Sequence, residues 1–199
     1  MKKIAALFVI IAAVSGCSTI PEQKSSTNTA PPTAPMKPTA PVASAAPVAS
    51  APATASNHSK LTVVKVDSEE TSGENGTGKN AVDGNPETIW HTEWQDATPE
   101  HPHEIIIKLN EPTTLKGFTY LPRQDDSENG TIKDYEFYLS DDGKDFGQPV
   151  KKGTLDSGKE KKTVTFDAKK CQFIKLRALS EVNDGAWTSA AEIDVITAD

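Results

Sequence analysis

Cysteine, positive charge and helical periodicity are all scarce in this sequence. The formal net charge of −7 argues against partners made of nucleic acid and against attraction to anionic lipid headgroups. Of the two cysteines, Cys171 lies in an alternating apolar run with no base near it, which predicts a small core residue rather than a nucleophile. No stretch beyond residue 60 sustains a 3.6-residue period, and no Ser/His/Asp order with a nucleophile elbow is present. These shortages disfavour a helical domain and a hydrolase.

Long apolar runs are also missing, because the longest one, residues 4–14, is too short to span a bilayer. It follows Lys2 and Lys3 and ends in VSGC, which resembles a bacterial lipobox. The resemblance implies a lipoprotein signal peptide over residues 1–16, lipidation of Cys17 and a membrane anchor; the alternative is an ordinary secretory signal with a chance cysteine. Ser18 follows where an inner-membrane retention aspartate would stand, so we expect a cell-envelope lipoprotein, at the outer membrane if the organism is Gram-negative.

The segment 17–59 is dominated by Pro, Ala, Ser and Thr, with almost no aromatic or large aliphatic residues. Such a composition cannot bury enough apolar surface to offset the chain entropy lost on folding. We therefore expect a disordered tether after Cys17, in which His58 has no role, and a folded domain over residues 60–199.

The pattern from residue 60 onward predicts strands throughout. Short runs rich in β-branched and aromatic residues occur at 61–67, 103–110, 115–122, 132–140, 161–167, 172–179 and 191–197. Asn-Gly and Asp-Gly pairs predict turns beginning at Asn75, Asp83, Asn129, Asp142 and Asp184. We therefore predict an all-β domain, an antiparallel β-sandwich or barrel with long polar loops.

Several segments, in order, carry a family resemblance. KNAVDGNPETIWHTEW, then HEIIIKL, GFTYLPRQDDSENGTIKDYEFYLSDDGKDF and FIKLRALSEVNDGAWTSAAEIDV, together resemble a coagulation factor 5/8 type C (discoidin) domain. Within that superfamily the chain is most similar to the family 32 carbohydrate-binding modules, over residues 61–197. The resemblance implies a jelly-roll, galactose-binding-domain-like β-sandwich, one structural calcium ion, and galactose-type sugars bound by loops at one end.

Calcium requires six to eight oxygen ligands, many of them main-chain carbonyls. The turn Asp-Gly-Asn-x-x-Thr gathers oxygen donors on a sharply folded chain, although on its own it is equally a plain tight loop. By resemblance, side chains come from Asp83, Thr88 and Glu192, and mainly carbonyls come from Asn80, Asn85 and Ala191.

A neutral sugar requires a flat apolar surface for its C–H face and planar polar side chains for its hydroxyls. By resemblance, the ligand-binding residues are His91, Arg123, Asn129, Glu74 and Trp187. The polar neighbours Thr92 and Glu93 favour an exposed His91 over a buried core histidine.

Each candidate also has a structural interpretation. Arg123 could form a surface salt bridge to Asp125 or Asp126, and Trp187 could be a buried anchor under its loop. Trp90 and Trp94 are interpreted mainly as core or loop-packing residues on either side of His91.

His101 and His103, two residues apart, could form a zinc clip. Pro102 breaks the regular strand, however, and no third ligand has a convincing spacing. We favour a loop that leads into a strand.

The sequence therefore favours a membrane-anchored, non-catalytic carbohydrate-binding protein whose partner is a glycan or small saccharide. The alternative is a discoidin-like adhesion domain that binds a protein or other cell-surface ligand. The loops are polar and acidic with one tryptophan, which disfavours a lipid ligand. An enzyme is not expected, because no carboxylate pair with a raised pKa can be identified.

Overall fold

The computed structural model describes residues 60–198. The signal peptide 1–16, the lipidation site Cys17 and the tether 17–59 with His58 lie outside the described residues and remain predictions. Within the described part, no helix is both long and apolar enough to cross a membrane.

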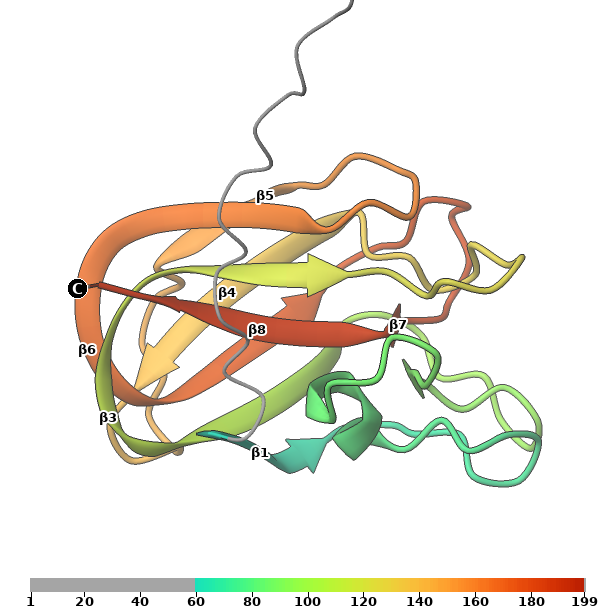
Figure 1. Cartoon of the computed structure of the whole chain (residues 1–199). Helices are drawn as coiled ribbons and strands as arrows, with labels where there is room; N and C mark the ends of the chain where they lie inside the picture. Colours follow the sequence, from blue (N-terminus) through green and yellow to red (C-terminus); the bar gives the residue numbers. More distant parts are fainter. Residues whose placement is uncertain (1–59, 199) are drawn as a thin grey trace, which may run out of the picture. The chain divides into compact units, whose positions relative to one another are not determined.

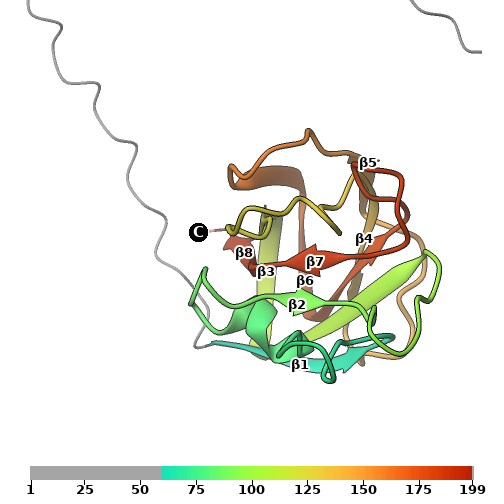
Figure 2. The same cartoon turned by 90° about the vertical axis from the view of Figure 1, so that its right-hand side faces the viewer.

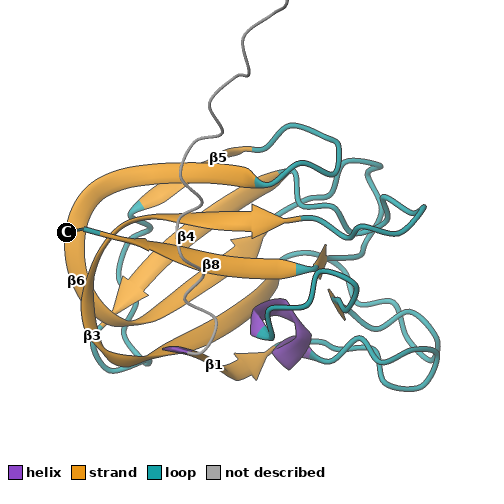
Figure 3. Ribbon diagram, viewed as in Figure 1, coloured by secondary structure: helices purple, strands orange, loops and turns teal. Residues whose placement is uncertain are grey.

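The domain is an all-β antiparallel sandwich, as the sequence predicts (Figures 1 and 3). Its elements are β1 (Leu61–Val66), the 3-10 helix η2 (Gly78–Val82), β2 (Trp90–His91), β3 (His103–Leu121), β4 (Asp134–Ser140), β5 (Lys151–Thr154), β6 (Lys162–Ala178), β7 (Ser189–Ala190) and β8 (Glu192–Thr197). Six strands form one hydrogen-bonded sheet in the order β1-β3-β6-β4-β5, with β8 also paired to β3, and β2 pairs with β7.

The two long strands β3 and β6 bend so that each belongs to both layers (Figure 1). In the first half of β3, residues 105–109 pair with β1 on one side, and residues 103–108 pair with residues 173–178 of β6 on the other. Beyond register shifts between residues 108 and 117, the second half of β3 pairs with β8 and with residues 162–165 of β6. The sheet is thereby folded into two layers, and the apolar face of each layer packs against the other to form the core.

The core between the layers is aromatic at its centre. Phe118 of β3 stacks on Phe137 of β4, with ring centroids 4.1 Å apart, and meets the edge of Tyr135. Trp90 is fully buried, which confirms its interpretation as a core residue. Cys171 is buried as well, and burial raises the pKa of its thiol to about 11, which confirms the core role and fits poorly with a nucleophile.

Several elements differ from the sequence prediction. The runs 103–110 and 115–122 form one strand, β3, and the runs 161–167 and 172–179 form one strand, β6, because the chain bends without leaving the hydrogen-bonded ladder. Strand β5 was missed because its four residues are all exposed and show no alternation. The two-residue strands and η2 are too short to have a periodicity of their own.

The long loops lie together at one end of the sandwich, which faces the viewer in Figure 2. They comprise residues 67–102, 122–133, 155–161 and 179–191, which follow or precede the strands at that end. Leu61, where β1 begins, pairs with Leu109 at the opposite end. The first described residues are thus remote from the loop cluster.

Candidate functional site

The loop end contains a cavity of about 320 Å³. All five predicted ligand-binding residues line it, together with two that were not predicted: Glu74, His91, Trp94, Arg123, Ser127, Asn129 and Trp187. They come from three loops and from β2, so the fold gathers residues that are up to 113 positions apart in the chain, from Glu74 to Trp187.

His91 forms part of the cavity wall, although its side chain is only 3% exposed. The expectation of an exposed histidine was wrong, because β2 pairs with β7 and places His91 opposite Ser189. Its Nδ1 lies 2.6 Å from the Thr92 carbonyl oxygen, which can only accept, so Nδ1 carries the proton. Burial lowers the pKa of His91, which leaves the ring neutral at pH 7 with Nε2 as an acceptor.

Arg123 is also buried, at 8% exposed, and its guanidinium is held as a fork. Nε and Nη2 donate to the two carboxylate oxygens of Asp125 at 2.7 and 2.5 Å, and Nη1 donates to the Asn129 carbonyl at 3.3 Å. The predicted ion pair to Asp125 therefore forms, between a buried guanidinium and a carboxylate whose side chain is 55% exposed at the surface. Among the described residues three of the five N–H donors are used, so two remain for hydroxyl groups of a ligand.

Trp94 is a site residue that the sequence interpretation assigned to packing. Its indole is 38% exposed, lines the cavity, and donates from Nε1 to Glu74 Oε1 at 3.0 Å. Trp187 is half-buried, so its exposure is intermediate between that expected of a ligand contact and that expected of a buried anchor. Its Nε1 is buried and has no hydrogen-bond partner among the described residues. Two indole rings thus supply the apolar surface of this cavity.

The wall formed by Glu74 and Trp94 is organised by Glu70, which the sequence analysis did not identify. Its carboxylate is 1% exposed and accepts four backbone N–H groups at 2.7–2.9 Å, two from residues 72–73 and two from residues 94–95. These bonds, led by the one from Trp94, lower the pKa of Glu70 to about 2. Gly73 lets the loop approach the indole, because a Cβ there would lie 2.6 Å from two Trp94 ring atoms.

The opposite wall has a similar clasp. The fully buried Glu181 accepts the backbone N–H of Gly185 at 2.7 Å and that of Gly130 at 3.3 Å, joining the loops 122–133 and 179–191. Gly130 has φ of +80°, and a Cβ there would lie 2.7 Å from the Ser189 backbone nitrogen. The predicted Asn-Gly turn is therefore required in order to present Asn129 beside Arg123.

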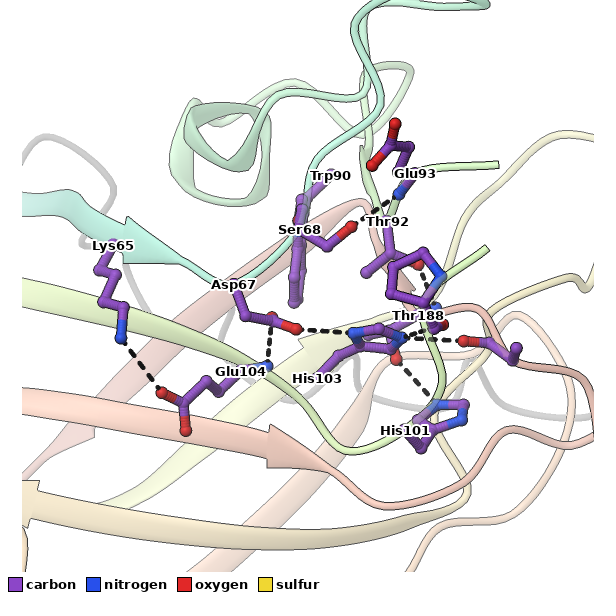
Figure 4. A network of polar contacts seen from close by, with 12 residues as sticks. Lys65, Asp67, Ser68, Trp90, Thr92, Glu93, His101, His103, Glu104 and Thr188 are labelled. Carbon is purple, nitrogen blue, oxygen red and sulfur yellow. Dashed lines mark hydrogen bonds and ion pairs between the residues drawn. The ribbon is translucent and has the colours of Figure 1, made fainter. Parts of the chain in front are cut away.

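Behind the cavity, His103 joins the start of β3 to two loops (Figure 4). Its Nδ1 donates to Asp67 Oδ2 at 2.8 Å, and Nε2 donates to the carbonyls of Ala186 at 2.8 Å and Pro99 at 3.2 Å. Burial alone would lower the pKa of His103, but the Asp67 carboxylate and the carbonyls raise it. Because both nitrogens face only acceptors, the ring is an imidazolium and holds Ala186, next to Trp187, in place.

This arrangement bears on the zinc hypothesis. The rings of His101 and His103 are 4.9 Å apart, but neither nitrogen of an imidazolium has a lone pair for a metal. Among residues 60–198, no group of three or more His, Cys, Asp or Glu side chains is arranged to hold a metal. β3 begins at His103, directly after Pro102, which confirms the interpretation as a strand start.

The predicted calcium-binding residues lie in η2, in the turn that follows it, and at or directly before the start of β8, which contacts η2. Asp83 accepts the Asn85 N–H at 2.8 Å and the Thr88 hydroxyl at 2.8 Å, which closes the turn. Glu192, at the start of β8, is 6% exposed, and burial together with the charge of Asp83 raises its pKa to about 7. Asn80 is buried, and its side-chain Nδ2 donates to the backbone carbonyls of Asn75 and Ile89.

This donor set consists of hard oxygens, which suits calcium and not zinc. The charge of Asp83 disfavours ionisation of the Glu192 carboxyl, and a divalent cation between the two groups would relieve that repulsion. The residues therefore fit the ion that the sequence predicts. Ala191, the remaining predicted ligand, is fully buried and precedes Glu192 in the chain.

Comparison with known proteins identifies this type of domain. The model of the F5/8 type C domain family matches residues 54–193. CpGH89CBM32-5 from Clostridium perfringens, solved with GalNAc-β-1,3-galactose, is 35% identical with a TM-score of 0.65, over 70% of this chain and 97% of that one. The family 32 module of Clostridium perfringens NanJ, solved with galactose, is 30% identical with a TM-score of 0.60, over 69% of this chain and 94% of that one.

Among curated proteins, the chain is 37% identical over 140 residues to a sialidase of Micromonospora viridifaciens, covering 70% of this chain and 22% of the sialidase. It is 38% identical over 119 residues to a galactose oxidase of Gibberella zeae, covering 59% of this chain and 18% of the oxidase. The chain thus spans about a fifth of the length of these relatives, which share with it one domain. The matches, the fold and the cavity agree that the chain belongs to the F5/8 type C domain family and is like the family 32 carbohydrate-binding modules within it.

Proposed function

We propose that this protein is a non-catalytic, membrane-anchored carbohydrate-binding protein that recognises galactose-type sugars in the loop-end cavity. The observation that supports this most directly is the composition of that cavity. It combines two indole rings with His91 Nε2, the Asn129 amide and the unused donors of Arg123, which are the groups that a sugar ring requires.

The charges of the cavity favour a neutral sugar over an acidic one. The Arg123 charge is already compensated by Asp125, Glu74 adds a negative charge, and His91 is neutral. A uronic acid would meet a net negative wall and would have to compete with Asp125 for the guanidinium.

A structural calcium ion is part of the proposal. Asp83, Thr88 and Glu192 would hold it with side-chain oxygens, and Asn80, Asn85 and Ala191 would supply mainly carbonyls. When bound, the ion supplies positive charge between two carboxylates and connects the loop 83–88 to β8. The galactose-type sugar in the loop-end cavity lies elsewhere in this proposal and does not contact the ion, because none of these six residues lines that cavity.

The anchor and the location are proposed from the sequence of residues 1–18. We infer that Cys17 is lipidated, and that the protein lies in the outer membrane where the cell has two membranes. Cys17→Ser tests this step separately, because the variant should move from the membrane fraction to the soluble fraction while its sugar binding stays unchanged.

Titration calorimetry of the full chain with galactose, N-acetylgalactosamine and lactose tests the central proposal. Small modules of this type are expected to bind with a Kd of about 0.1–1 mM, or about −4 to −5.5 kcal/mol. His91→Ala and Arg123→Ala should abolish the heat of binding. If a broad glycan array gives no signal, while a protein ligand is captured equally well by both variants, the adhesion alternative replaces this proposal.

A further inference from the structure

A second cavity, of about 260 Å³, lies beside the first on the loop end. Glu74 lines both cavities, and Asp125, which lines the second cavity, accepts hydrogen bonds from Arg123, which lines the first. The two hollows therefore share a wall and are not separate sites.

The lining of the second cavity has the chemistry of a sugar subsite. Asn75 and Glu87 are exposed side chains whose amide and carboxylate can bind hydroxyls, and Pro86 and Ile89 supply apolar surface. Gln124 is held rigidly at one side, since its Nε2 donates to the Pro122 carbonyl at 2.7 Å and the Lys159 carbonyl at 3.0 Å.

The charges of this lining select among sugars. Glu74 and Glu87 are acidic, Asp125 is already paired with Arg123, and no lysine, arginine or histidine lines the cavity. A carboxylated or sulfated sugar would be repelled, whereas the hydroxyls of a neutral sugar find acceptors. Because no indole ring lines the second cavity, we do not expect it to bind a monosaccharide by itself. We expect it to add affinity for a glycan whose terminal sugar is bound in the first cavity.

Resting on the proposed function, we propose that the second cavity is an extension subsite for the neutral sugar next to the galactose-type unit of a glycan. Two additional hydrogen bonds of ordinary net strength would make a suitable disaccharide bind about tenfold tighter than its terminal monosaccharide. The first cavity then sets which terminal sugar binds, and the second sets which linkage is preferred.

The test compares ligand length in the full chain and in the double variant Asn75→Ala/Glu87→Ala by calorimetry. Galactose and N-acetylgalactosamine serve as monosaccharides, and lactose, N-acetyllactosamine and GalNAc-β-1,3-galactose as disaccharides. Both substituted side chains are exposed, and Asn75 holds Asn80 through its backbone carbonyl, which alanine keeps, so the fold should persist. Asp96→Ala is the matched control, because Asp96 is an exposed loop-end carboxylate that lines neither cavity.

We expect at least one disaccharide to bind about tenfold tighter than its monosaccharide in the wild type and in the control, and the double variant to lose this gain while its monosaccharide affinity stays the same. The subsite is refuted if no disaccharide binds tighter than its monosaccharide, or if the double variant keeps the gain. Absence of any monosaccharide binding in the wild type would instead contradict the proposed function itself.

Discussion

Replacing Asp67 by asparagine should expose how the ion pair behind the cavity depends on pH. The imidazolium of His103 is completely buried, whereas the Asp67 side chain is 29% exposed. Hydrogen bonds to a charged group contribute about 1.5–3 kcal/mol each, and partial exposure of the carboxylate reduces this, so the variant should lose about 2 kcal/mol near pH 6. The Glu104 N–H, which donates to Asp67 Oδ1 at 2.7 Å, adds to the loss if the amide turns its nitrogen toward it.

The sign of the pH dependence follows from the direction of each pKa shift. His103 has a raised pKa in the folded state, so its contribution is complete below the unfolded value of about 6.5 and is lost as pH rises through the folded pKa. Asp67 has a lowered pKa, so its contribution is present above about 3.9 and is lost as pH falls through the folded pKa. The pair therefore stabilises the domain most between about pH 4 and 6.5.

His91 and His101 act in the opposite direction, because burial lowers the pKa of both and the folded state resists their protonation below about pH 6.5. The pH profile of the wild type alone is thus a sum of opposed effects. The difference between the wild type and Asp67→Asn removes the common part and isolates the pair.

The assay is urea unfolding of both proteins from pH 5 to pH 9. The difference in the free energy of unfolding should be about 2 kcal/mol at pH 5–6 and should shrink toward about 1 kcal/mol or less as His103 loses its proton. A difference that stays constant from pH 5 to 9 would refute the assignment of His103 as an imidazolium.

Three further outcomes are expected. Glu70→Gln should weaken galactose binding and speed amide exchange at residues 94–95, because an amide NH₂ meets two N–H donors where a carboxylate oxygen accepted them, whereas Glu93→Gln should change neither. Calcium at a hundredfold excess over its Kd should stabilise the wild type by about 2.7 kcal/mol and so raise its thermal midpoint. Glu192→Gln should remove this effect. A thermal midpoint of the wild type that calcium does not change would contradict the calcium proposal. Galactose affinity should be constant above about pH 6.5 and fall as pH drops through the lowered pKa of His91, because the imidazolium Nε2 no longer accepts; affinity unchanged at pH 4 would contradict that role.

The sequence predicted the fold class because the strand runs of this domain are short, β-branched and separated by Asn-Gly and Asp-Gly turns. It could not show that two pairs of runs were single bent strands, since bending depends on the pairing partners on both sides. At Asp184, the turn was located, but the aspartate and not the following glycine has positive φ, at 56°.

Five of the seven residues that line the main cavity were identified through family resemblance, and their spacing in the chain would not have indicated that they lie together. Glu70 was missed because its role lies in accepting backbone N–H groups from a loop more than twenty positions away, which no local pattern reports. Trp94 was assigned to packing for a related reason, since nothing near it in sequence shows that Gly73 and Glu74 receive its ring.

The indole N–H resonances of the three tryptophans test the central claim most directly. Trp94 and Trp187 line the cavity, whereas Trp90 is buried in the core with its Nε1 bonded to the Ser68 carbonyl at 3.0 Å, so it serves as an internal control. Addition of galactose to the isotope-labelled full chain should shift the Trp94 and Trp187 signals in a saturable way and leave Trp90 in place. Unchanged signals for Trp94 and Trp187 at saturating galactose would contradict sugar recognition in this cavity.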